Sequence, residues 1–89
     1  MKKSMLDILA CPIDKYYPLE LFEIISEGQA IKQGVLFCCK CSRYYPIIDE
    51  IPIMLPDELR EEESDIDFLK KWQNKIPDKI IKQGSPWHL

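Results

Sequence analysis

The first half of the chain follows a pattern that is typical of β-strands. Residues 19–25 alternate imperfectly between apolar and acidic side chains, and extended character resumes at 30–33 and 35–38. A period of two is expected for a strand with one buried face. We therefore predict a strand at 19–25, a turn at 26–29 and extended chain over 30–38, with a bulge or turn at Gly34.

Two further apolar segments follow, at 44–48 and 51–56, with a break at Asp49 and Glu50. Pro52 has no N–H, so the second segment should form an edge strand. Residues 47–56 are apolar at positions that face both sides of a strand, and such a strand needs cover on both sides. The cover is either a partner chain or the C-terminal helix, through Phe68, Leu69 and Trp72.

Helical spacing occurs at both ends of the chain. Ser4 and Asp7 have the spacing of a capping box and predict a short helix that Pro12 stops. Apolar residues recur at helical spacing between 57 and 76, and a second capping box at Ser64 predicts a break there. The expected fold is α+β. Residues 1–89 form one domain, in which 1–56 is a ribbon-like antiparallel core with a short N-terminal helix. Residues 57–76 are a helical segment packed on one face, and 77–89 are a tail.

Composition and charge narrow the class of protein. The 89 residues are 46% hydrophobic and 30% charged, which describes a globular domain too small to enclose a large cofactor cleft. No segment reaches the ~18 apolar residues of a membrane span, and the charged N-terminus is unlike a signal peptide, so we expect a cytoplasmic protein. The net charge of −3 disfavours direct binding to nucleic acid.

Charge is also unevenly distributed along the chain. Residues 57–69 hold seven acids and one arginine, whereas 70–89 hold five lysines and one acid. Acidic residues near the start of a helix and lysines near its end interact favourably with the helix dipole, so this pattern indicates a solvated helix. The alternative interpretation is that the acidic residues form a docking surface.

The cysteines suggest a metal site. Cys38 and Cys41 form a C-x-x-C pair, in which a tight turn points two thiolates at one ion. The second half of such a site would be residues 11–14, where Asp14 stands in place of a second cysteine. Carboxylate oxygens bind zinc at about 2.0–2.2 Å, so Cys11, Asp14, Cys38 and Cys41 form a candidate zinc set.

Other interpretations of the cysteines remain open. The thiols are either metal ligands, bare thiols, or in part a disulfide between Cys11 and one of the others. His88 is a remote candidate for a fourth ligand. Cys39 is expected to be a small buried hydrophobe, because neighbouring strand residues point to opposite faces.

The sequence contains no recognisable catalytic set. It has one histidine and no glycine-rich phosphate loop, and its adjacent carboxylates would diverge. We therefore expect a protein that is not an enzyme.

Three blocks occur in one order: Leu-Asp-Ile-Leu-Ala-Cys-Pro at 6–12, Gly-Val-Leu-Phe-Cys-Cys-Lys-Cys-Ser-Arg-Tyr-Tyr-Pro-Ile at 34–47, and Ile-Pro-Ile-Met-Leu-Pro at 51–56. Together they resemble the small activator subunit shared by several methyltransferases of the translation machinery, in its short archaeal form. The resemblance spans roughly residues 4–60.

This resemblance implies a zinc-ribbon-like, non-catalytic subunit that forms a heterodimer with class I S-adenosylmethionine-dependent methyltransferases. Those enzymes modify tRNA, rRNA or a release factor. The subunit would add an edge strand to its partner and cover its apolar surface. The family's zinc cysteines would fall on Cys11, Cys38 and Cys41, with Asp14 at or near the fourth. Partner contacts would fall on Tyr45, Ile47, Ile51, Pro52, Ile53, Met54, Leu55 and Pro56.

Two functions other than methyltransferase activation are alternatives. A stand-alone ribbon that binds nucleic acid or a transcription complex would use the C-terminal lysines, which are Lys70, Lys71, Lys75, Lys79 and Lys82. A rubredoxin-type iron site is suggested by the Cys-Pro pair at Cys11 but lacks its fourth cysteine.

Overall fold

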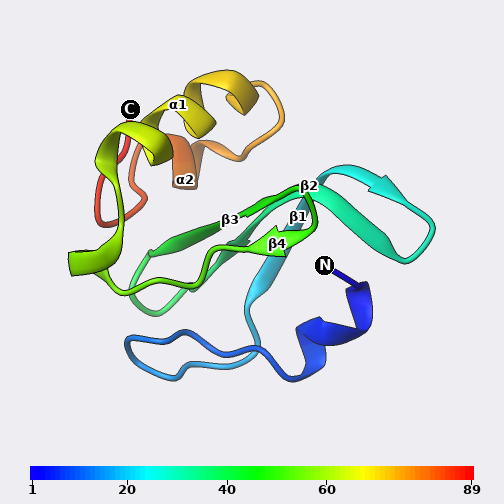
Figure 1. Ribbon diagram of the computed structural model, residues 1–89. Helices are drawn as coiled ribbons and strands as arrows, with labels where there is room; N and C mark the ends of the chain where they lie inside the picture. Colours follow the sequence, from blue (N-terminus) through cyan, green and yellow to red (C-terminus); the bar gives the residue numbers. More distant parts are fainter.

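Four strands form one antiparallel sheet in the order β1-β2-β3-β4 (Figure 1). The computed structural model describes residues 1–89, with β1 at Glu20–Glu27, β2 at Ala30–Phe37, β3 at Tyr44–Ile48 and β4 at Ile51–Pro52. Each strand pairs with the next one along the chain. Asp49 and Glu50 both have positive φ, of 50° and 70°, which is the backbone of a tight two-residue hairpin turn between β3 and β4.

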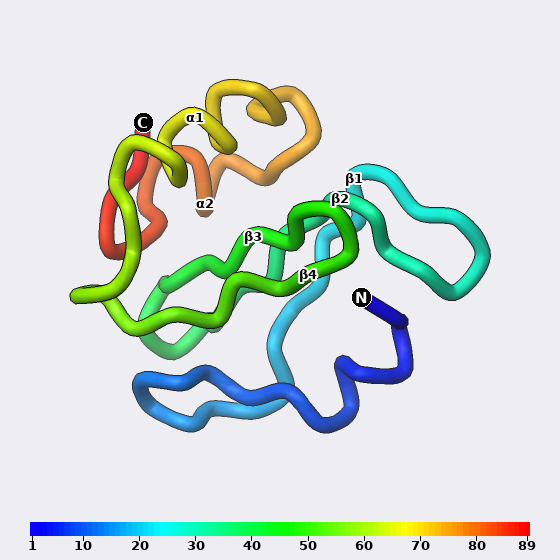
Figure 2. The backbone as a smooth tube through the Cα atoms, viewed as in Figure 1, coloured from blue at the N-terminus to red at the C-terminus, as the bar shows by residue number.

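The helical segments lie on both sides of this sheet. They are the 3-10 helices η1 (Lys3–Asp7) and η2 (Asp57–Leu59) and the α-helices α1 (Glu62–Trp72) and α2 (Asp78–Ile81). The backbone trace places α1 and α2 on one side of the sheet and the N-terminal segment with η1 on the other (Figure 2). The predicted α+β fold, with a short N-terminal helix and a C-terminal helix on one face, is confirmed. No helix has the length and apolar character needed to cross a membrane.

The sheet separates two hydrophobic clusters, because alternate residues of β2 and β3 point to opposite faces. The first cluster joins the sheet to the N-terminal segment and contains Met1, Cys11, Leu19, Ile31, Leu36, Cys38, Tyr45 and Ile47. The second joins the sheet to α1 and α2 and contains Val35, Phe37, Tyr44, Phe68, Leu69, Ile76, Ile80 and Ile81. The C-terminal third of the chain therefore supplies the cover for one face of the sheet.

Both predicted capping boxes are wrong. The first helix begins at Lys3, with Lys2 at its N-cap and no side-chain cap, so Ser4 lies inside it. Helix α1 begins at Glu62 and runs through Ser64 without a break. The interruption falls earlier, at Arg60, where an extended backbone separates η2 from α1 and turns the arginine side chain into the core.

Two strand predictions also differ from the structure. β2 continues through Gly34, because a Cβ there would lie 2.9 Å from the Phe22 carbonyl oxygen, and glycine lets the two backbones approach. The register shifts on both strands just beyond Gly34, where Ile24 of β1 and Lys32 of β2 are each left without a partner residue. The strand expected at 51–56 is regular only at Ile51–Pro52.

Candidate metal centre and sheet edge

Two turns with the same backbone pattern hold the candidate metal ligands. In the first knuckle, residues 11–16, the Cys11 N–H donates to the Tyr16 carbonyl at 3.0 Å. The Cys11 carbonyl accepts from the Lys15 N–H at 2.8 Å, and Lys15 has a φ of 60°. Cys11 and Asp14 both lie in this turn.

The second knuckle, residues 38–43, repeats this pattern. The Cys38 N–H donates to the Arg43 carbonyl at 2.9 Å, and the Cys38 carbonyl accepts from the Ser42 N–H at 2.8 Å. Ser42 has a φ of 62°, matching the first knuckle. Cys41 therefore holds the same place here that Asp14 holds in the first knuckle.

The two knuckles bring all four candidate ligands together. One donor atom from each of Cys11, Asp14, Cys38 and Cys41 lies within 4.8 Å of every other. The Cys11 and Cys41 sulfurs are 3.7 Å apart, and the Cys38 sulfur is 3.6 Å from either Asp14 oxygen. With Zn–S and Zn–O bonds of about 2.3 and 2.1 Å, a tetrahedral site has S–S and S–O separations of about 3.8 and 3.6 Å. The residues present therefore fit one zinc ion.

The surroundings of Asp14 and Cys38 shift the pKa values of these two donors in opposite directions. The Tyr16 N–H bonds to Asp14 Oδ1 at 2.9 Å and is the main cause that lowers the pKa of this carboxyl. Burial raises the pKa of the Cys38 thiol to about 12, so metal binding at neutral pH would have to release its proton.

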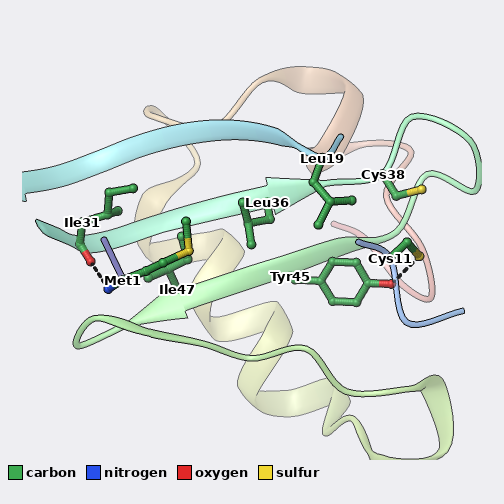
Figure 3. Close-up of a cluster of buried hydrophobic side chains, with 8 residues drawn as sticks. All are labelled: Met1, Cys11, Leu19, Ile31, Leu36, Cys38, Tyr45 and Ile47. Atoms are coloured by element: carbon green, nitrogen blue, oxygen red, sulfur yellow. Dashed lines mark hydrogen bonds between the residues drawn. The ribbon is translucent and has the colours of Figure 1, made fainter. Parts of the chain in front are cut away.

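Tyr45 supports the site from the core (Figure 3). Its phenol oxygen is 3.0 Å from the Cys11 sulfur, and burial raises the pKa of the phenol. The phenol therefore keeps its proton at neutral pH and can donate it to the sulfur. Hydrogen bonds of this kind orient ligands and tune their basicity.

The remaining cysteine and histidine candidates lie outside this cluster. Cys39 is exposed, which corrects the expectation that it is buried: β2 ends at Phe37, so the alternation that would have turned Cys39 inward has stopped. All four cysteines are free thiols. His88 is exposed, and its ring bonds to the Gly84 carbonyl at 3.2 Å.

The predicted docking residues divide into two groups. Ile51 is 61% exposed and Leu55 is 38% exposed, whereas Pro52, Ile53, Met54 and Pro56 are half-buried. Tyr45 and Ile47 have no exposed surface, because both point into the first cluster (Figure 3). The expectation that these two side chains contact a partner directly is therefore wrong. Both belong to the core.

The outer side of β4 has main-chain groups that face away from the sheet. The Ile53 N–H bonds inward to the Pro46 carbonyl at 2.8 Å. Main-chain groups of successive residues in an extended segment point to alternate sides, so the Pro52 carbonyl and the N–H and carbonyl of Met54 face outward. We call this outer side of residues 51–56 the docking edge.

A buried ion pair anchors α1 beside this edge, and no sequence pattern predicts it. The Arg60 and Asp65 side chains are only 1% and 9% exposed, and Arg60 Nε lies 2.9 Å from Asp65 Oδ2. Arg60 also donates to the Tyr44 carbonyl, and its guanidinium lies 4.8 Å from the Tyr44 ring centroid. Trp87 Nε1 donates to the same Asp65 oxygen at 3.1 Å, which ties in the C-terminus.

Comparison with known proteins agrees with this geometry. The model of the Trm112p-like protein family matches residues 2–50. A UPF0434 protein of Maricaulis maris (strain MCS10) is 40% identical over 61 residues, which are 65% of this chain and 78% of the relative. A UPF0434 protein of Dechloromonas aromatica (strain RCB) is 41% identical over 61 residues, covering 68% and 90%.

A solved structure resembles this one as well. It contains the Haloferax volcanii Trm112 methyltransferase activator in complex with a protein assigned as a methyltransferase. The matched chain is 42% identical, with a TM-score of 0.64, and the match covers 67% of this chain and 100% of the other. The family match ends at residue 50, so α1 and α2 lie outside it.

Proposed function

This chain belongs to the Trm112p-like protein family, and we propose that it is a non-catalytic subunit that binds, stabilises and activates methyltransferases. Its partners would be class I S-adenosylmethionine-dependent enzymes that modify tRNA, rRNA or a release factor. The partner would bring the cofactor pocket and the substrate chemistry, and the two chains would form a heterodimer. The similar Haloferax volcanii activator, in complex with its enzyme, supports this proposal.

The observation that carries the proposal is the docking edge. Ile51 is 61% exposed on an edge strand whose outward main-chain groups have no partner strand within the chain. An apolar edge of this kind pairs readily with a strand from another chain, and the added main-chain hydrogen bonds contribute affinity. Burying each exposed isoleucine or leucine would contribute up to about 1.5–3 kcal/mol.

The opposite edge of the sheet, β1, is protected. Its pairing with β2 is irregular around Ile25, and bulges discourage a further strand from joining. Charged side chains also line it: Glu20 pairs with Lys79 at 3.0 Å and Glu23 with Lys3 at 3.2 Å. This asymmetry favours β4 as the side for the partner.

Zinc would have a structural role in this scheme. Cys11 and Asp14 from the first knuckle and Cys38 and Cys41 from the second would hold it, and the ion would cross-link the N-terminal segment to the β2–β3 turn. The second knuckle leads directly into β3, the strand that pairs with β4, so a fixed knuckle helps to fix the docking edge.

Co-expression tests the proposal. Class I methyltransferases from the same genome are produced with and without the full chain, and soluble complexes are separated by size and weighed by native mass spectrometry. We expect at least one enzyme to be recovered as a 1:1 complex and to be poorly soluble when produced alone. Failure of every enzyme to associate, with tRNA bound to the free chain at physiological salt instead, would favour a nucleic-acid-binding ribbon.

A further inference from the structure

The C-terminal third of the chain builds a groove beside the docking edge. We propose that this groove receives an extended segment of the methyltransferase in which one apolar side chain is flanked by lysine or arginine. The inference rests on the proposed function, and it specifies the chemistry of the partner segment.

The groove lies between the β3–β4 region and the start of α1. Its first part encloses about 260 Å³, and its apolar wall includes Ile48, Ile53, Leu55 and Leu59. A second hollow shares Ile48 and Ser64 with it and continues along α1 to Trp72. The volume of the first part is enough for one apolar side chain, and the continuation accommodates the residues beside it.

The position of the groove links it to the docking edge. Ile53 and Leu55 line the groove, while Met54, between them, packs on the first hydrophobic cluster. A strand that pairs along the outward main-chain groups of Pro52 and Met54 would therefore run beside the groove. Alternate side chains of that strand would face the side on which α1 lies.

Charge around the groove selects the flanking residues. Glu58, Glu61, Glu62 and Glu63 are all exposed, and none of them forms an ion pair. The single cation in this stretch, Arg60, is buried and paired with Asp65. Along the two hollows themselves, Glu61, Asp49 and Asp67 form no ion pair and Lys71 is the one unpaired cation. The groove is therefore net negative, which attracts a cationic segment and repels RNA.

Arg60 adds a requirement inside the groove. It lines the first part, and its Nη2 atom is buried without a hydrogen-bond partner. An unpartnered buried donor is unfavourable, so a small shift of the Arg60 side chain that let this atom reach a main-chain carbonyl of the occupant would be stabilised.

The test uses the full chain and a methyltransferase recovered with it by co-expression, in surface binding kinetics at low and high salt. Leu59→Asp changes the apolar wall at a side chain that is 62% exposed. The double variant Glu61→Lys/Glu62→Lys replaces two negative charges at the start of α1 with two positive charges. Ile8→Asp, at a residue 78% exposed on the N-terminal segment, and Glu27→Lys, at the exposed end of β1, are the matched controls.

We expect Leu59→Asp to raise the dissociation rate about tenfold or more, since most effects of interface mutations appear in that rate. The double lysine variant should lower the association rate about tenfold at low salt, and the difference should disappear near 0.5 M salt, where screening is strong. Both controls should bind like the unmodified chain.

Two results would overturn the inference in distinguishable ways. If both groove variants bind like the unmodified chain while Ile51→Asp loses binding, the docking edge stands and the groove is not part of the interface. If the unmodified chain binds no methyltransferase, the proposed function fails and this inference fails with it.

Discussion

Asp14 occupies in the first knuckle the place that Cys41 occupies in the second. The two turns share main-chain hydrogen bonds, and each has a residue of positive φ immediately after the ligand position. A single carboxylate thus completes a set whose other three donors are sulfur. Zinc accepts such a set, although carboxylate is a harder ligand than thiolate, so Asp14 should weaken the site without abolishing it.

Zinc should therefore stabilise the protein, and above the dissociation constant the gain should grow with the logarithm of its free concentration. At about 100 times its dissociation constant, a ligand that binds only the folded state adds about 2.7 kcal/mol, or roughly 10–20 °C in a domain of this size. Thermal unfolding with zinc and with a chelator measures the difference. Equal midpoints, together with no zinc by elemental analysis, would show that the knuckles fold without metal.

Replacing Asp14 with cysteine should tighten the site. The variant has four thiolates in the same backbone geometry, so it should keep zinc at chelator concentrations that strip the unmodified chain. Asp7→Cys, which adds a thiol at an exposed position outside the cluster, is the control. Identical zinc retention by the Asp14→Cys variant and the control would contradict the assignment of Asp14.

Removing only one partner of the buried Arg60–Asp65 ion pair should strongly destabilise the fold. Asp65→Ala leaves the guanidinium buried without its carboxylate and should lower the free energy of unfolding by about 3–5 kcal/mol. The double variant Arg60→Met/Asp65→Leu removes both charges and should recover most of that loss. Urea unfolding measures all three proteins, and a double variant less stable than Asp65→Ala would contradict this account.

Ile51→Asp should abolish methyltransferase binding and leave the fold intact, because its side chain is 61% exposed. Ile25→Asp is the matched control, with 45% exposure on the opposite edge of the sheet, and should bind normally. Co-purification and thermal unfolding are measured on each variant. Met54 is not suitable for this test, because it packs against the first hydrophobic cluster and an aspartate there would also disturb the fold.

The Arg43–Asp57 pair predicts a pH dependence. Two hydrogen bonds of 2.9 and 2.7 Å from Arg43 hold the pKa of the Asp57 carboxyl below its usual range. A lowered pKa means that the stabilisation is fully present above the unfolded value of about 4 and is lost as pH falls through the folded value. Asp57→Asn should therefore cost about 1 kcal/mol or less at pH 7, since the pair is partly exposed. The difference should shrink as pH falls below about 4, as urea unfolding across pH can show, and a constant difference would contradict it.

Much of the fold could be predicted from local patterns. The strand at 44–48 has the predicted bounds, because β-branched and aromatic residues are concentrated between a knuckle and the Asp49–Glu50 turn. The position of α1 followed from helical spacing, but its start did not. Arg60 is held in an extended conformation by tertiary contacts with Tyr44 and Asp65, and no local rule encodes them.

The residues of the candidate site could be predicted from the sequence, but the directions in which some of their side chains point could not. Cysteine spacing was enough to propose which four residues meet, and the set stays a prediction until metal is measured. The orientation of Tyr45 and Ile47 was not predictable, since residues 44–48 are apolar on both faces and two clusters compete for them. The groove residue Leu59 was missed because its 3-10 turn was expected to be helix.

We propose that this chain activates a methyltransferase by binding it through β4. The most direct measurement is methyl transfer from S-adenosylmethionine by a purified partner enzyme as increasing amounts of the full chain are added. We predict a rate that rises and levels off at one equivalent, and no rise with Ile51→Asp. A rate that is unchanged by the chain, or that rises equally with Ile51→Asp, would contradict the account.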